Sequence, residues 1–439
     1  MNKLIIIGRK GSFYRYLIFL FCLGLVIPFF TYEPRIKLGD YKIYCNPRAK
    51  INFKKTYHLQ LWDYNWPLGE GKTNYSNYLK KAIREFGKEY PNIRVDLTLL
   101  DLYNGPGRLE KALKANEAPD VYCSPFTVPS FNFKRQIPVG PYLKRKEMTV
   151  YPASIRSELE YDKVLCSFPR WAIPGLWIGN SSLLSEAGVS PGKIQTSGWT
   201  WEEFALLAKK YVNRKYLLVG SLGPWGFFTQ LLMNSGFNSS AAAIPSSAQS
   251  INLTVDYLES LIQQKAIPED CDQHMLDRFL SGQAVILAGV RPALYNYLIQ
   301  KLAAANCNWR PVLLPVPVYR PGREILLMEL SAISIFHNKK TAGNDHLTAA
   351  VKLGQFLSCY QDPNPCNQMM VMPVHSQSAE DWLKNNGLHK KLFYRFIETG
   401  QFRILSSQPG YIQKVYPVLL DLMAKKTTAA EAKAKLLAP

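Results

Sequence analysis

The sequence predicts a chain of two α/β lobes that follow an N-terminal apolar segment. Its 439 residues, 47% of them hydrophobic, exceed the size of one domain, which usually holds about 100–200 residues. Strand-like and helical patterns alternate along most of the chain, which is typical of mostly parallel sheets covered by helices. A long uncharged run near the N-terminus sets the start of the chain apart from these lobes.

The N-terminal run predicts a membrane anchor. No charged residue occurs between Tyr16 and Tyr32, and four basic residues precede this run. Its length is near the lower limit for spanning a bilayer, and the basic flank would keep the N-terminus cytoplasmic. A cleaved signal peptide is the competing interpretation, but no small-x-small site follows, and Phe21 before Cys22 argues against a lipobox. We expect an uncleaved anchor over residues 1–32, with the rest of the chain extracytoplasmic at the cell membrane.

The net charge of +20 indicates anionic surroundings but no particular ligand. The basic residues are scattered rather than gathered in one tract, so an ordinary solvated basic surface explains most of this charge. Nucleic-acid binding has no motif to support it, and an external location argues against it.

The sequence contains no motif that predicts a metal site or a cofactor. No CxxC pair is present and the six histidines stand far apart, so we expect no metal site. The segment "LGEGKT" lacks the first glycine of a phosphate loop, because Trp66 stands there, so we expect no nucleotide cofactor. Beyond Cys22 the seven cysteines are odd in number, and Cys359 and Cys366 could close a small loop between them.

The first lobe is predicted element by element. Residues 33–56 are polar and aperiodic and look like a linker, and 57–64 then alternate as a strand does. A helix with an apolar face follows over 78–86, and a turn at Pro91 leads into a second strand. A further helix, a turn at Pro119 and a third short strand complete this unit.

Capping signals and apolar faces predict further helices along the chain. Asn180 can cap a helix that stops at Gly188. Thr200 and Glu203 form the pattern of a capping box at the start of another helix. The segments "VDYLESLIQQ" and "HLTAAVKLGQFLS" are two more amphipathic helices.

The stretch "DRFLSGQAVILAGVRPALY" predicts a buried strand between two helices. Ser281-Gly282 ends the first helix, 284–288 form an unbroken apolar run, and Gly289 stops this strand just before Arg291.

Five segments form one ordered set from about Tyr57 to the C-terminus. They are "LKKAIREFGKEYPNIRVDL", "KANEAPDVYCSP", "FPRWAIPGLWIGNSSLLSEAGVSP" with "TWEEFALLAKK", "FLSGQAVILAGVRPALY" and "TTAAEAKAKL". In this order they resemble the family 1 extracellular solute-binding proteins of ABC importers, the group that includes maltose-binding protein.

The resemblance implies a type II periplasmic-binding-protein-like fold, in which a ligand lies in a cleft between two α/β lobes. This agrees with the rule that ligands bind beyond the carboxyl ends of parallel strands. It places the crossings near Trp171–Pro174, Val312–Pro315 and Ser358–Pro363. Lobe 1 then comprises 57–171 and 314–358, and lobe 2 comprises 172–313 and 359–439.

The resemblance also implies the residues that face the ligand. They follow strands or lie at crossovers, and aromatic residues predominate because the C–H faces of sugars are apolar. Core packing is the alternative for each tryptophan. The candidates are Trp62, Asp63, Trp66, Ser124, Thr127, Trp171, Trp177, Trp225, Arg291 and Tyr411.

Arg291 departs from the family pattern. Many sugar-binding members carry an aromatic residue here, whereas arginine can bind hydroxyls or a carboxylate through its planar fork. An acidic or decorated saccharide therefore gains ground as the ligand. The alternative is a surface arginine that caps a loop.

The resemblance implies a monomeric binding protein that captures a saccharide and delivers it to ABC permease subunits in the membrane. The main alternative is a membrane-anchored sensor that presents its ligand to a histidine kinase. We do not expect an enzyme, because a glycosidase needs paired carboxylates and only Asp63, Asp120 and Glu329 lie near the candidate loops.

Overall fold

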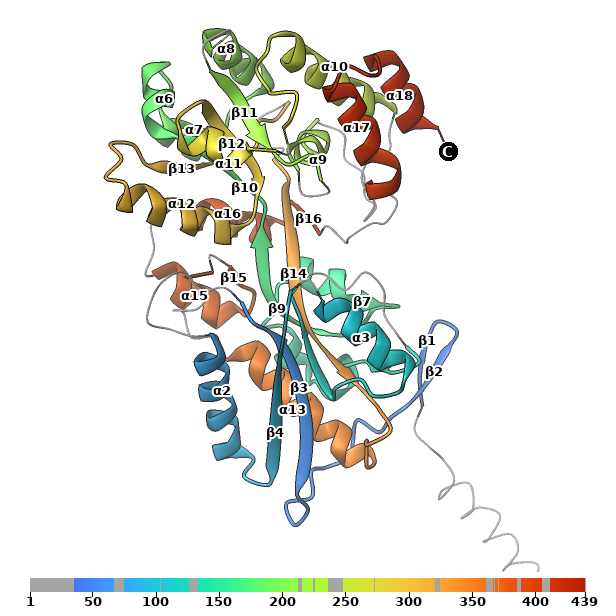
Figure 1. The fold of residues 1–439 in the computed structure, drawn as a ribbon. Coiled ribbons are helices and arrows are strands. Elements are labelled where there is room, and N and C mark those ends of the chain that lie inside the picture. Colours follow the sequence, from blue (N-terminus) through green and yellow to red (C-terminus); the bar gives the residue numbers. More distant parts are fainter. Residues whose placement is uncertain are drawn as a thin grey trace, which may run out of the picture.

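Two α/β lobes lie one above the other, and strands run between them (Figure 1). The structure is a computed structural model. It describes residues 35–66, 75–102, 104–125, 133–211, 215–223, 226–235, 248–271, 273–319, 324–360, 366, 368–369, 371–384, 388–404 and 411–438.

Lobe 1 is built on a mixed eight-stranded sheet. The main path of the sheet holds β15 (Met372–Pro373), β9 (Phe168–Pro174), β14 (Leu326–Phe336), β5 (Val121–Ser124), β3 (Tyr57–Tyr64) and β4 (Ile93–Leu100). Two short strands, β6 (Gln136–Ile137) and β16 (Phe402–Ile404), also pair with β14. The predicted strand–helix rhythm is confirmed for β3, β4 and β5, which are parallel, whereas β9 and β14 run antiparallel to each other.

The main helices that cover this sheet bury an apolar face against it. In α2 (Tyr75–Glu89) the buried residues Tyr75, Tyr78, Leu79, Ala82 and Phe86 recur at helical spacing. The longest helix of the lobe, α13 (Asn344–Cys359), packs against β9 and β14. The other described helices of this lobe are α3 (Gly105–Lys114), α4 (Arg145–Met148), α5 (Ala153–Arg156) and α15 (Ser376–Lys384). Helix α16 (Leu388–Thr399) contacts both α5 of this lobe and α7 (Pro191–Ser197) of lobe 2. Two one-turn helices, η1 (Gly140–Tyr142) and η2 (Ser157–Leu159), and a hairpin of β7 (Glu160–Tyr161) with β8 (Val164–Leu165) connect them.

Lobe 2 is built on a four-stranded sheet. Its spatial order is β11 (Tyr216–Gly220), β12 (Ala284–Val290), β10 (Leu176–Asn180) and β13 (Pro311–Leu314). Its helices are α6 (Ser181–Glu186), α7 (Pro191–Ser197), α8 (Trp201–Tyr211), α9 (Phe227–Met233), α10 (Ala248–Gln263), α11 (Met275–Leu280), α12 (Pro292–Ala304), η3 (Tyr411–Val415), α17 (Tyr416–Met423) and α18 (Ala429–Leu437). One apolar cluster joins α8, α9, α10, α17 and α18 to the sheet, so the C-terminal helices belong to this lobe.

The predicted capping signals are confirmed. The Asn180 side chain accepts a hydrogen bond from the amide of Leu183 (3.2 Å). Thr200 and Glu203 bond reciprocally, side chain to backbone, at the start of α8. These side chains satisfy amides that the first helical turn leaves unpaired, so both helix starts are encoded locally.

Among the described residues, the chain passes between the lobes at Gly175, between β9 and β10, and again between β13 and β14. Further along the chain, β15 pairs with β9 and β16 pairs with the start of β14, so both strands belong to the sheet of lobe 1. Between these two strands, α16 contacts both α5 of lobe 1 and α7 of lobe 2. The lobe boundaries near Trp171–Pro174, Val312–Pro315 and Ser358–Pro363 stay predictions.

The segment expected to be a linker is instead part of lobe 1. Strands β1 (Arg35–Leu38) and β2 (Tyr41–Tyr44) form a hairpin whose Leu38 and Ile43 are buried in the core. The amide of Asn46 bonds to the Asn344 side chain (2.7 Å) at the start of α13. Four-residue strands surrounded by polar residues carry too weak a period to be recognised in the sequence.

The expected anchor at Tyr16–Tyr32 lies outside the described residues. Within the part of the chain that the structure describes, no helix has the length and apolar character needed to cross a bilayer.

None of the seven described cysteines forms a disulfide, so Cys359 and Cys366 are not joined. Five of these seven cysteines are buried, so they behave mainly as small apolar core residues.

A buried ion pair fixes the centre of lobe 1. Arg170 on β9 donates from Nη1 to Oδ2 of Asp63 on β3 (2.8 Å), and both side chains are only 1% exposed. Tyr75 on α2 completes the network, because its hydroxyl donates to Asp63 Oδ2 (2.9 Å) and accepts from Arg170 Nη2 (2.8 Å). The network thus ties two strands and a helix together by charge-assisted hydrogen bonds.

We expect Asp63→Ala to lower the free energy of unfolding by about 3–5 kcal/mol, because Arg170 would keep a buried charge without its partner. Urea unfolding followed by tryptophan fluorescence measures the change. Glu110→Ala, which removes an exposed partner of Lys114, is the control and should have little effect. Equal effects of the two substitutions would show that the buried pair does not stabilise lobe 1.

Candidate functional site

Three of the predicted ligand-facing residues cannot be placed. Thr127 and Trp225 lie outside the described residues, and for Tyr411 the structure describes the backbone of η3 but not the side chain. Their role stays a prediction.

Two predicted ligand-facing tryptophans lie in the core. Trp171 and Trp177 have no exposed surface. Trp171 packs edge-on against Trp66 and Tyr75 in lobe 1, and Trp177 packs against Phe204 in lobe 2. Both residues belong to strands that are buried along their whole length, so the core-packing alternative describes them.

The candidates at the end of β3 are also mostly buried. Trp62 lies within β3 rather than after it, is 9% exposed and packs with Tyr122 and Phe336. Arg108 of α3 lies 4.9 Å from the Trp62 ring and covers it. Asp63 belongs to the buried ion pair, and the Ser124 carbonyl accepts from Ser331 Oγ (2.7 Å). In this structure these side chains stabilise lobe 1.

Arg291 is the predicted residue that reaches the boundary between the lobes. Gly289 has a φ of +69°, and β12 is paired with β10 through Ala288 and Val290, so the glycine forms a β-bulge. Glycine adopts this left-handed conformation without steric cost, and the bulge re-aims the residues that follow. The strand therefore ends at Val290, one residue later than predicted, and Pro292 starts α12 at once.

Arg291 meets a carboxylate of the other lobe. Its Nη2 donates to Oε1 of Glu329 on β14 (3.1 Å), and the guanidinium side chain is half exposed whereas that of Glu329 is only 4% exposed. Strand β14 leaves lobe 1 toward lobe 2 at this end (Figure 1). The ion pair therefore joins the two lobes directly.

Burial raises the pKa of Glu329 to about 7, and the nearby Arg291 opposes this rise only in part. The carboxyl group is thus partly protonated near neutral pH, which is unusual for a glutamate. A buried titratable group with one charged partner is a feature that functional sites often share.

Other contacts between the lobes surround this pair. The Asn234 side chain, just after α9, bonds to both backbone groups of Ile325 (2.8 and 3.0 Å). Met233 packs on Leu327, and the Gly175 amide donates to the Leu327 carbonyl (2.8 Å). We call this region the seam: residues 173–176, 233–234, 290–291 and 325–329.

Sequence reasoning counted Glu329 among the few acidic residues near the candidate loops but did not predict that it or Asn234 faces the ligand, although one signal was present. Glu329 is the single charge in the apolar run "LLMELSAISIF". A charge within a fully buried strand needs a partner or a function, so this position could have been singled out. Asn234 follows α9 in an ordinary polar turn and carries no such signal.

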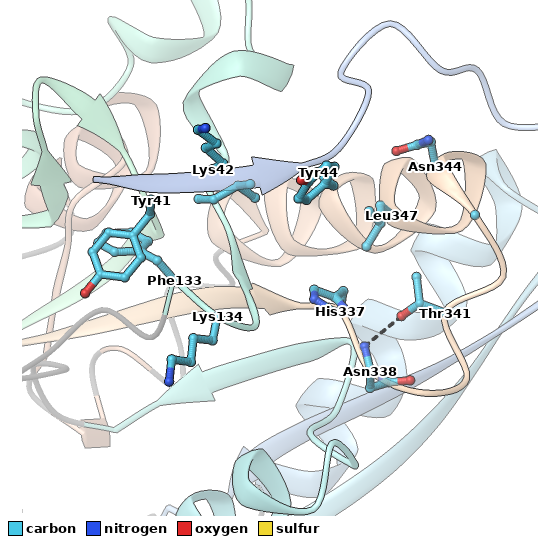
Figure 2. Close-up of a pocket in the computed structure, with 12 residues that line it drawn as sticks. Tyr41, Lys42, Tyr44, Phe133, Lys134, His337, Asn338, Thr341, Asn344 and Leu347 are labelled. Atoms are coloured by element: carbon cyan, nitrogen blue, oxygen red, sulfur yellow. Dashed lines mark hydrogen bonds between the residues drawn. The ribbon is translucent and has the colours of Figure 1, made fainter. Parts of the chain in front are cut away.

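Three cavities lined by described residues lie elsewhere. The largest two have volumes of about 570 Å³ and about 560 Å³, and the third about 220 Å³. Figure 2 shows the cavity between the β1–β2 hairpin and the start of α13, where Tyr41, Tyr44 and Phe133 lie near His337 and Thr341. None of these three cavities includes a predicted ligand-facing residue.

The described residues contain no cluster of three or more histidine, cysteine or carboxylate side chains that could hold a metal ion.

Comparison with known proteins agrees with this architecture. Residues 71–264 match the sequence model of the family described as bacterial extracellular solute-binding protein. No curated protein matches the chain.

Solved structures share the fold over most of the chain. The sugar-binding protein MalE from Xanthomonas citri is 17% identical with a TM-score of 0.66, over 86% of this chain and 95% of that one. A family 1 extracellular solute-binding protein from Bifidobacterium longum subsp. infantis is 14% identical with a TM-score of 0.66, over 87% and 98%. Maltose-bound MalE3 of T. maritima is 17% identical with a TM-score of 0.64, over 87% and 98%. The chain therefore has the two-lobe fold of the bacterial extracellular solute-binding proteins, and residues 71–264 carry the sequence signature of that family.

Proposed function

We propose that the protein captures a saccharide between its lobes and delivers it to an ABC importer, acting as a binding protein rather than an enzyme. The observation that carries the proposal is the seam, where Arg291 of lobe 2 contacts Glu329 of lobe 1. A polar side chain from each lobe is what a ligand needs if its binding is to draw the lobes together. Two of the structural neighbours, a sugar-binding MalE and a maltose-bound MalE3, support a saccharide as the ligand.

The ion pair changes the expected chemistry of the ligand. The sequence favoured an acidic saccharide because Arg291 offers a positive charge. Glu329 now supplies a counter-charge within the protein, so a ligand carboxylate is no longer required to balance the guanidinium. We therefore propose a hydroxyl-rich saccharide, with Arg291 as a hydrogen-bond donor to hydroxyl oxygens.

The location of the protein follows from the same proposal. Residues 1–32 would anchor the chain in the membrane and hold the two lobes on the extracytoplasmic side, next to the permease subunits. Co-purification of two permease subunits with the full chain would support delivery, whereas co-purification of a histidine kinase would support a sensor.

We expect at least one saccharide to raise the melting temperature of the purified full chain and to reduce its radius of gyration in small-angle X-ray scattering. A ligand at about 100 times its Kd adds about 2.7 kcal/mol to the stability of the folded state, and closure brings the lobes nearer. The probes are glucose, galactose, maltose, maltotriose, cellobiose, trehalose and sucrose. Sorbitol at equal concentration is the co-solvent control. If these sugars act no differently from sorbitol, the proposed function is wrong.

The raised pKa of Glu329 predicts a pH-dependent stability. Between the pKa of an unfolded glutamate, about 4.3, and about 7, the folded protein keeps a proton that the unfolded chain has lost, so stability falls as pH rises through this window. Glu329→Gln cannot titrate, so its stability relative to the parent should rise by about 3 kcal/mol between pH 4.5 and pH 8.

Urea unfolding at several pH values measures this difference. Glu269→Gln, at an exposed glutamate paired with Lys425, is the matched control and should follow the parent at every pH. Parallel profiles for Glu329→Gln and the parent would contradict the raised pKa.

A further inference from the structure

We propose that Glu329 and Gln230 contact the bound saccharide directly and select for a hydroxyl group at one position of the sugar. This inference rests on the proposed function, and it assigns two binding residues that the family resemblance did not indicate. Each residue is buried near the seam and has one polar atom without a hydrogen-bond partner among the described residues.

Glu329 leaves half of its carboxylate unused. Oε1 accepts from Arg291 (3.1 Å), whereas Oε2 has no hydrogen-bond donor among the described residues although the residue is only 3% exposed. Leaving a buried polar atom unpaired costs about 1–3 kcal/mol and more for a charged group, so such an atom needs an explanation. A ligand donor at Oε2 would remove this cost.

Gln230 presents the complementary group. Its Oε1 accepts a hydrogen bond from Trp177 Nε1, which fixes the orientation of the amide. Its Nε2 then points a donor away from Trp177 and finds no acceptor among the described residues, although the residue is only 1% exposed. The amide therefore offers a donor from lobe 2.

The two residues lie on opposite sides of the same boundary. On α9, Gln230 shares a helix face with Met233 and Asn234, which contact the start of β14. On β14, Glu329 shares a strand face with Leu327, the residue that Met233 touches. Trp177, which holds Gln230, comes only two residues after the crossing at Gly175.

A sugar hydroxyl matches this pair because it both donates and accepts a hydrogen bond. It would donate to Oε2 of Glu329 and accept from Nε2 of Gln230, and Arg291 could bind a neighbouring hydroxyl. Since Glu329 belongs to lobe 1 and Gln230 to lobe 2, one hydroxyl would connect the lobes. The alternative is a structural water that satisfies the same two atoms, and substitution of either residue would then leave the affinity for saccharides unchanged.

The test is calorimetry on the full chain with the seven saccharides named above. Glu329→Gln keeps the shape of the side chain but removes the charged acceptor. Gln230→Glu keeps the Oε1 that holds Trp177 but replaces the donor with a carboxylate oxygen. Each change should weaken the binding of every saccharide that binds the parent by about 10- to 100-fold, the range for a hydrogen bond to a charged or buried group. Glu269→Gln, at an exposed glutamate paired with Lys425, is the control and should bind like the parent.

A thermodynamic cycle with deoxy sugars distinguishes a direct contact between the sugar and Glu329 from an indirect structural effect of the substitution. For a saccharide that binds the parent, deoxy analogues are measured with the parent and with Glu329→Gln. The analogue that lacks the selected hydroxyl should lose affinity for the parent but lose little more for the variant, because both changes remove the same bond. Circular dichroism and melting temperature check that each variant is folded. Gln230→Glu provides the same cycle if Glu329→Gln does not fold.

Each outcome decides the matter. If saccharides bind the parent and both variants equally, or if all deoxy analogues lose affinity additively with the substitutions, this inference is wrong and the proposed function stands. If no saccharide binds the parent, both are wrong. Selective loss in the variants, with one non-additive hydroxyl, supports the direct contact.

Discussion

The structure depends on two strands that leave lobe 1 together, hydrogen-bonded to each other. β9 and β14 are paired from Phe168 to Pro174, so the strand that leaves lobe 1 and the strand that returns to it form one hydrogen-bonded ribbon. Beyond this ribbon only Gly175 separates β9 from β10, and its amide still bonds to Leu327. Arg291 and Glu329 lie on either side of this junction and contact each other directly.

Lobe 1 contains two buried carboxylates, Asp63 and Glu329, whose polar atoms are satisfied to different degrees. Asp63 and Arg170 are both deeply buried, but Tyr75 and the backbone amide of Tyr64 satisfy the carboxylate, so the network is structural. Glu329 is equally buried, but it has a half-exposed partner and one oxygen that no described residue hydrogen-bonds. The difference explains why the first acid stabilises the fold, while the second, with a pKa raised to about 7, is the better candidate for ligand chemistry.

Aromatic residues near the crossings did not identify the ligand site. Trp62, Trp171 and Trp177 follow the expected pattern in the sequence, yet the structure packs all three into cores. A large apolar ring near a strand end gains as much free energy from neighbouring strands as from a sugar face, so position alone does not separate the two roles. The polar residues of the seam distinguish core packing from ligand contact better than the aromatic residues do, because leaving a buried polar atom without a hydrogen-bond partner costs free energy.

The sequence by itself determined the elements with strong local signals. It predicted β3 at Tyr57–Tyr64, the caps at Asn180 and Thr200, the breaks around β12 and the two-lobe fold, because periodicity, capping side chains and glycines act within a few residues. Only the tertiary structure decided that 35–44 form a hairpin on lobe 1, that β15 and β16 pair with strands of that lobe and that Glu329 faces Arg291. These features depend on pairing between residues tens or hundreds of positions apart, and local patterns carry no information about which distant partner supplies the hydrogen bond or the charge.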